Sequence, residues 1–166
     1  PGPVDTTGDT DFDGPLAIPP LAGSSVDADG TRVFALEAQA GTTEFEPGVA
    51  SETWGFNGSY LGPTLVAERG EHVRVEVTNS LDEPTTVHWH GMHLPAEMDG
   101  GPHQMVAPDA SWSPEWDIDQ QAATLWYHPH PHHATAGQVH RGLVGFLLVR
   151  DEEEDALALP SGPREV

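Results

Sequence analysis

The sequence predicts an all-β protein. Short runs of alternating apolar and polar residues recur between turn signals, and no long helical pattern occurs. The length of 166 residues suits one domain with a single core. The 18 glycines and 16 prolines are typical of a chain in which many turns join short strands. Together these observations favour an antiparallel sandwich or barrel of about eight strands.

The clearest strand is HVRVEVTN at 72–79, where Val73, Val75 and Val77 alternate with polar residues. A second is SWSPEWDID at 111–119, whose two tryptophans share one parity. Only 131–140 has room for a helical turn, and the tail from 151 is expected to form an acidic loop and an extended end. The remaining strands are expected at 32–39, 52–56, 64–67, 86–92, 123–128 and 142–150.

The expected domain organisation has two parts. Residues 1–30 are rich in Pro, Gly and Asp with little periodicity, which predicts an extended N-terminal arm over the surface, held by Leu16, Ile18 and Leu21. Residues 31–166 are then a single domain.

Composition excludes several classes of function. With 27 acidic against 6 basic residues the net charge is −21, so nucleic acid is not an expected partner. The chain has no cysteine, which excludes disulfides, zinc-thiolate sites and thiolate-ligated copper within it. No run of about 18 apolar residues occurs and the first residues lack signal-peptide features, so we expect a soluble, already processed chain without a membrane partner.

Four of the ten histidines form two short pairs, HWH at His88 and His90 and HPH at His128 and His130. On a strand, residues i and i+2 project from the same face about 6–7 Å apart. Each pair could therefore present two imidazoles to one side, a spacing better suited to two neighbouring metals than to one. Imidazole without thiolate, and with few carboxylates nearby, favours copper or zinc.

The other histidines are expected to lie outside this site. Asp99, in the MDGG segment, could orient a ligand or pass protons, but an Asp before two glycines is equally typical of a turn. His72 is expected to be exposed at the start of a strand, and His93 and His103 to lie in loops as turn residues or as partners of a ligand. The histidines that follow HPH closely could add an accidental metal site: His132, His133 and His140.

With these motifs in view, the chain resembles the multicopper oxidases, which include laccases, bilirubin oxidases and cuprous oxidases. The segments that carry the resemblance are TWGFNGSYLGPTLVAERGEHVRVEVTN, TTVHWHGMHLP, MDGGPHQ and ATLWYHPHPHHATAGQVHRGLVGFLLV, between 53 and 149. HWHG followed by WYHPH is highly specific. The resemblance implies the N-terminal domain of a three-domain member, with a Greek-key β-sandwich or barrel of the cupredoxin type.

The resemblance also implies copper as cofactor. His88 matches the ligand of the type 2 copper, His90 and His128 match ligands of one type 3 copper, and His130 matches a ligand of the other. Asp99 matches an acid that assists proton delivery to dioxygen. The family's last domain supplies four more histidines and the Cys of the type 1 copper, none of which is present here. The chain therefore looks like an isolated first domain whose partners are the remaining cupredoxin domains and dioxygen.

Three hypotheses follow for function. The first is an oxidase domain that supplies half of a trinuclear copper cluster, inactive alone, in an extracellular or periplasmic protein. The second is a stand-alone module for copper storage or transfer, self-associating through its histidine face. The third is a protein-binding domain on the same fold. Because the ligands must be neutral, copper affinity is expected to fall as pH drops through about 6.

Overall fold

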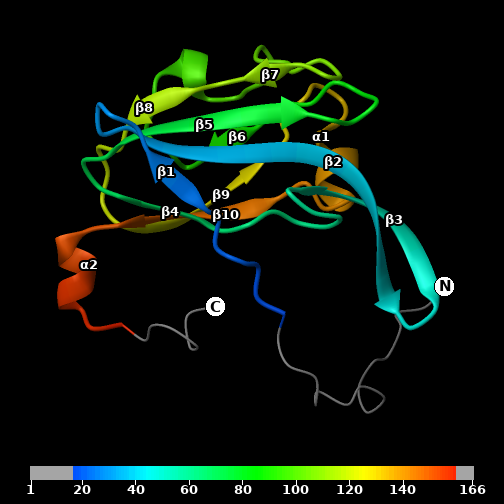
Figure 1. The fold of residues 1–166 in the computed structure, drawn as a ribbon, viewed down its shortest axis with the longest axis horizontal. Coiled ribbons are helices and arrows are strands. Elements are labelled where there is room, and N and C mark those ends of the chain that lie inside the picture. Colours follow the sequence, from blue (N-terminus) through cyan, green and yellow to red (C-terminus); the bar gives the residue numbers. More distant parts are fainter. Residues whose placement is uncertain (1–16, 160–166) are drawn as a thin grey trace.

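The computed structural model describes residues 17–159, which form two β-sheets packed face to face (Figure 1). In the larger sheet the order is β1 (Ser24–Val26), β2 (Arg32–Glu46), β5 (His72–Asn79) and β7 (Ser111–Trp112), while β3 (Val49–Phe56) pairs with β2 and β8 (Glu115–Asp117) with β5. In the smaller sheet the order is β4 (Leu65–Glu68), β10 (Gly145–Arg150), β9 (Ala123–His128) and β6 (His88–His90).

Both sheets are mixed, so the expectation of a purely antiparallel sandwich is wrong in two places. β2 runs parallel to β5, and β10 runs parallel to β4. The other named strand pairs are antiparallel. Alternation of apolar and polar residues assigns faces to a strand but carries no information about the direction of its neighbour.

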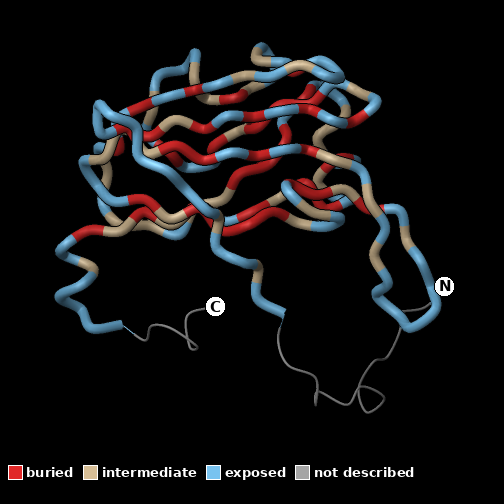
Figure 2. The backbone as a smooth tube through the Cα atoms, viewed as in Figure 1, coloured by how far each residue is buried: buried red, intermediate tan, exposed pale blue. Residues whose placement is uncertain are grey.

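The core lies between the two sheets, where Figure 2 shows the buried residues concentrated. The larger sheet contributes alternate residues such as Val73, Val75 and Val77, all at most 1% exposed. The smaller sheet contributes Trp89 and Tyr127, both fully buried and in contact through their rings. The two-residue period of β5 therefore became one buried and one outer face, as the sequence predicts.

Several strand bounds differ from those expected. β2 continues to Glu46 because its second half pairs with β3 in a hairpin that extends away from the sandwich (Figure 1). The 111–119 stretch divides into β7 and β8, separated by Ser113 and Pro114. Ser24–Val26, within the expected arm, pairs with β2 as an edge strand. Leu21 and Ile18 are exposed, whereas Leu16 and the rest of 1–16 lie outside the described residues.

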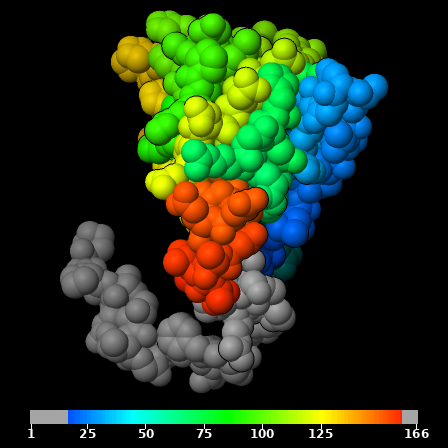
Figure 3. Space-filling view, turned by 90° about the vertical axis from the view of Figure 1, so that its left-hand side faces the viewer, coloured from blue at the N-terminus to red at the C-terminus, as the bar shows by residue number. Residues whose placement is uncertain are grey.

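Within residues 17–159, three short helices complete the fold: η1 (Ala96–Met98), α1 (Thr135–His140) and α2 (Glu152–Ala156). α1 falls where a helical turn is expected, but α2 replaces the start of the expected acidic loop. The side chain of Asp151 accepts a hydrogen bond from the backbone N–H of Glu154 and so caps α2. Acidic residues in a first turn also suit the helix dipole. Figure 3 shows this segment standing out at one end of the molecule.

No helix within 17–159 combines the length and apolar character that crossing a membrane requires.

Candidate metal centre

β6 places two histidines on the outer face of the smaller sheet and anchors them by the residue between them. Trp89 points into the core and is fully buried, so His88 and His90 must point the opposite way. β6 pairs antiparallel with β9, with His88 opposite His128 and His90 opposite Trp126. The strand ends at His90, because Gly91 after it has a φ of 92° and the backbone N–H of Met92 donates to the carbonyl of Trp89 in a turn. A residue with positive φ interrupts extended backbone, so β6 stops before the expected end at residue 92.

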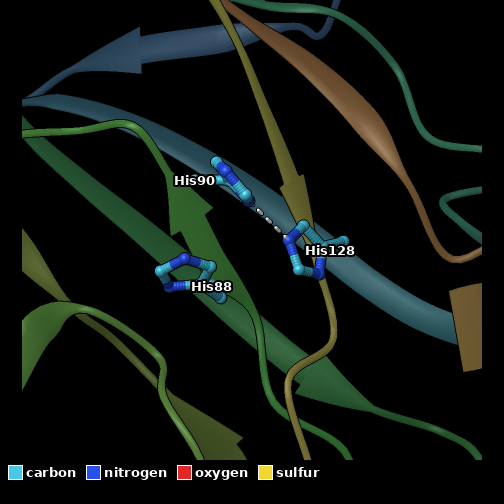
Figure 4. Close-up of side chains that lie close together, drawn as sticks. All are labelled: His88, His90 and His128. Carbon is cyan, nitrogen blue, oxygen red and sulfur yellow. Dashed lines mark hydrogen bonds between the residues drawn. The ribbon is translucent and has the colours of Figure 1, made fainter. Parts of the chain in front are cut away.

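Three imidazoles converge across this strand pair. One nitrogen from each of His88, His90 and His128 lies within 4.8 Å of the others. Nδ1 of His90 is 3.1 Å from Nε2 of His128, the contact drawn in Figure 4. The ring of His88 lies 5.6 Å from that of His90 and 5.4 Å from that of His128, between centroids. Among the described residues, no other group of His, Cys, Asp or Glu meets at this spacing.

The backbone fixes which nitrogen of His128 can bind a metal. Nδ1 lies 2.8 Å from the carbonyl oxygen of Pro129. A carbonyl only accepts, so Nδ1 carries the proton and the lone pair is on Nε2, directed at His90. Burial lowers the pKa of His128, opposed by the hydrogen bond to Pro129, and nearby imidazoles lower it further. The neutral form, which is the metal-binding form, is therefore favoured.

The loop that carries Asp99 orients His88 in the same way. Nδ1 of His88 donates to the backbone carbonyl of Asp99 at 2.9 Å, and a carboxylate oxygen of Asp99 lies 3.2 Å from the same nitrogen. This leaves the lone pair of His88 on Nε2. The loop can approach because residue 100 is glycine: a Cβ there would lie 1.7 Å from the carbonyl oxygen of Val87. Asp99 is therefore both a turn residue and a partner of His88.

The donor set fits a metal that prefers imidazole. Two nitrogens that bind one ion at about 2.0–2.1 Å lie roughly 3 Å apart, which is the separation of the His90 and His128 nitrogens. Without a proton or a cation between them, two facing lone pairs repel each other at that distance. Imidazole ligands suit copper and zinc among the common metals. His90 and His128 could hold one ion and His88 a neighbouring one, with coordination left for ligands from elsewhere.

His130 reaches the site differently from its partner. The two histidines of the HPH segment do not both lie on a strand, because β9 ends at His128 and His130 lies beyond it. Proline has no N–H, so Pro129 and Pro131 cannot extend the ladder. His130 is exposed, and its ring lies 5.3 Å from that of His88 and 6.0 Å from that of His128. It borders the group of three without belonging to it in this conformation.

The remaining histidines lie apart from this cluster. His72, on β5 in the other sheet, contacts Asp117 at 2.7 Å. The rings of His132 and His133 contact each other, with centroids 3.9 Å apart. These three histidines do not belong to the convergent group. The same holds for the other described histidines outside the two pairs, namely His93, His103 and His140.

Sequence reasoning missed the aromatic support of the cluster. The ring of Trp126 is stacked on His90 at 4.9 Å and contacts His128 at 4.1 Å, measured between centroids. Its position was readable: Trp126 is two residues before His128, so it lies on the histidine face of β9. It restricts the motion of both rings.

Comparison with known proteins finds multicopper oxidases and, at similar identity, a cell division protein. A family model described as multicopper oxidase matches residues 37–154. "Multicopper oxidase mco" of Staphylococcus aureus is 42% identical over 140 residues, 84% of this chain and 31% of that protein. "Cell division protein FtsP" of Escherichia coli (strain K12) is 40% identical over 147 residues, 89% of this chain and 30% of that protein. The crystal structure of a laccase from Pediococcus acidilactici Pa5930 matches with a TM-score of 0.85 at 40% identity, covering 89% of this chain and 32% of that one.

These relatives are much longer than the chain, which spans about 31% of the first of them. The solved structures it matches are cupredoxin-fold multicopper oxidases, so the predicted cupredoxin-type β-sandwich is confirmed. Copper is the cofactor that such a family implies, and the convergent histidines are a group that could hold it.

Proposed function

The chain belongs to the multicopper oxidase family, and from this premise we propose that it is the copper-binding first domain of a larger oxidase. In this proposal it supplies half of a type 2/type 3 trinuclear copper cluster that reduces dioxygen to water. The electrons come from an organic or metal-ion donor. The observation that carries the proposal is the convergence of His88, His90 and His128 within 4.8 Å on one outer face.

Each histidine has a distinct part in the proposed site. His90 and His128 hold one type 3 copper through the two nitrogens that lie 3.1 Å apart. His88 holds the type 2 copper through Nε2, since its Nδ1 is bonded to Asp99. His130 holds the other type 3 copper from the segment after β9. The chemistry that copper supplies when bound is the one-electron redox cycling that dioxygen reduction requires.

Asp99 is proposed to hold a proton for delivery toward dioxygen. Its carboxylate lies 3.2 Å from Nδ1 of His88, and its side chain is 38% exposed. It is therefore open to solvent on one side and next to a proposed copper ligand on the other. A carboxylate in that position can exchange protons with water and pass them toward the cluster.

The rest of the coordination is proposed to come from the other domains of the same oxidase. In this arrangement one ion has two nitrogen ligands, from His90 and His128, and its neighbour has one, from His88. Both ions therefore have fewer than the three or four ligands typical of imidazole sites. The histidine face also carries apolar side chains that another protein surface could cover: Phe146, 47% exposed, pairs in register with Trp126, which pairs with His90. We therefore expect the chain alone to have no oxidase activity.

A stand-alone copper module remains the second candidate, because three imidazoles already meet without any partner. In that case two or more copies would complete the coordination by joining their histidine faces. The family membership also supports an extracellular or periplasmic location for the parent protein, which cell fractionation would test.

Native mass spectrometry after copper loading and desalting tests the site and both candidates. We expect copper on the wild-type chain and less copper per chain on His88→Ala and on His128→Ala, with the β-sheet circular dichroism unchanged. His72→Ala is the matched control, because His72 lies on the other sheet. Copper on an oligomer that forms only with metal would favour the stand-alone module. Equal copper on wild type and both cluster variants would show that the cluster is not the site.

A further inference from the structure

His130 is the one histidine of the two pairs whose position no strand determines. β9 ends at His128, and the prolines on both sides of His130 remove the neighbouring N–H donors. The remaining backbone donor is the N–H of His130 itself. It donates to the side-chain oxygen of Thr86 at 2.7 Å. Thr86 is fully buried, so this hydrogen bond is shielded from water on the threonine side.

Thr86 also belongs to the chain segment that leads into β6. It lies two residues before His88, and its neighbour Val87 is fully buried in the core. The hydroxyl therefore joins the segment that carries one histidine pair to the segment that carries the other, across 44 residues of sequence. A shift of Thr86 would displace His130 relative to His88, whose rings lie 5.3 Å apart.

A second attachment holds the far end of the same loop. Gln138 of α1 is buried, and its side-chain amide donates to the carbonyl oxygen of Pro84 at 3.0 Å and to a carboxylate oxygen of Glu83 at 2.8 Å. Its side-chain oxygen accepts from the hydroxyl of Thr85 at 2.8 Å. The segment from His130 into α1 is thus joined to residues 83–86 at two points, His130 and Gln138.

We infer that Thr86 is a positioning residue for metal binding, which sets the place of His130 through its backbone N–H. This inference rests on the proposed function, since it concerns the same copper site. Gln138 holds α1 against residues 83–85, and Thr86 fixes the backbone of His130 itself. Thr86 does not touch the metal in this assignment; it acts only through His130.

The test removes the hydroxyl while keeping the shape of the side chain. Thr86→Val lacks the acceptor, and Thr86→Ser restores it. Thr53→Val is the matched control: Thr53 is also buried and its hydroxyl donates to the carbonyl of Ser59 at 2.7 Å, but it lies on β3 in the other sheet. Cu(I) affinity is measured by competition with bicinchoninate, and backbone amide exchange at His130 is measured by NMR.

We expect Thr86→Val to weaken Cu(I) binding about tenfold, Thr86→Ser to recover most of it, and Thr53→Val to leave it unchanged. In a His130→Ala background, Thr86→Val should weaken binding no further, because the residue acts through that imidazole. An equal loss in both backgrounds would show a general structural effect and overturn the inference.

Amide exchange separates this inference from the proposed function. The His130 N–H should be protected in wild type and Thr86→Ser, and should exchange at least about tenfold faster in Thr86→Val. If wild type binds no copper, the proposed binding fails, while protection of this amide still reports whether Thr86 holds the loop. Unprotected exchange at His130 in wild type would overturn the positioning role whatever the copper result.

Discussion

Replacing Gly100 by alanine should both destabilise the fold and disturb His88. Gly100 has a φ of 69°, and an alanine Cβ at this position would lie 1.7 Å from the carbonyl oxygen and 2.4 Å from the carbonyl carbon of Val87. The left-handed conformation costs a non-glycine residue about 1–2 kcal/mol. Val87 is fully buried immediately before β6, so its backbone cannot move aside freely.

The clash adds about 1–3 kcal/mol if it is relieved as other overpacked contacts are. We therefore expect Gly100→Ala to lower the free energy of unfolding by about 3 kcal/mol, which corresponds to a fall in Tm of about 6–12 °C for a domain of this size. The loop should relieve the contact by moving outward, which would break the hydrogen bond between Asp99 and His88. Copper affinity should then fall together with stability.

Gly101→Ala is the control, because the nearest atom to its added Cβ is the side-chain oxygen of Gln104 at an ordinary 3.8 Å. Urea unfolding of wild type, Gly100→Ala and Gly101→Ala gives their free energies of unfolding, and competition with a chelator gives their copper affinities. Gly101→Ala should stay within about 1 kcal/mol of wild type. If Gly100→Ala proves equally benign, the close approach of this loop to β6 is not a constraint, and the account of how Asp99 orients His88 is wrong.

Three further results are expected. Hydrogen bonds from Arg32 hold the pKa of Glu71 below its ordinary value of 4.5. The stability that this pair contributes is therefore fully present above pH 4.5 and is lost as the pH falls through the lowered pKa. Glu71→Gln should flatten the dependence of the urea midpoint on pH in that acidic range. Tyr127→Phe removes a donor to the carbonyl of Pro63 at 2.7 Å and should cost about 1–3 kcal/mol in thermal unfolding, since a buried carbonyl is left unpaired. Copper uptake by equilibrium dialysis should fall on acidification, because protonated imidazoles do not bind. Burial lowers the pKa of His128, so this ligand should stay neutral to lower pH than a free imidazole; full retention of copper at about pH 4.5 would contradict a histidine site.

The strand pattern was readable wherever alternation coincided with burial. β5 has the bounds that the sequence predicts, because its valines line one buried face without interruption. The same reasoning missed the extension of β2 to Glu46, since that part pairs with β3 in an exposed hairpin and needs no apolar face. It also missed α2, whose start depends on the local hydrogen bond between Asp151 and Glu154 and not on periodicity.

The convergence of the candidate ligands could be predicted from the sequence for His88, His90 and His128, whereas the position of His130 could not. Both histidines of HWH lie on one strand, β6, because Trp89 between them fills the core. Those of HPH do not, since the residues around His130 lack the N–H groups that a ladder requires. Long-range contacts such as Thr86 with His130, 44 residues apart, leave no periodic signal in a single sequence.

The alternation in β6 links the orientation of the candidate metal ligands to folding. Because Trp89 is buried against Trp116 and Tyr127, the register that fills the core also turns His88 and His90 outward. A slip of one residue would expose Trp89 and bury both histidines, so the hydrophobic core itself enforces the orientation of these two side chains. His128, on β9, is held by the same ladder, which pairs it with His88. His130 lies beyond the ladder and depends on its hydrogen bond to Thr86. Loss of core packing should therefore disturb His88, His90 and His128 together with the whole fold, whereas loss of the Thr86 hydrogen bond should displace His130 alone.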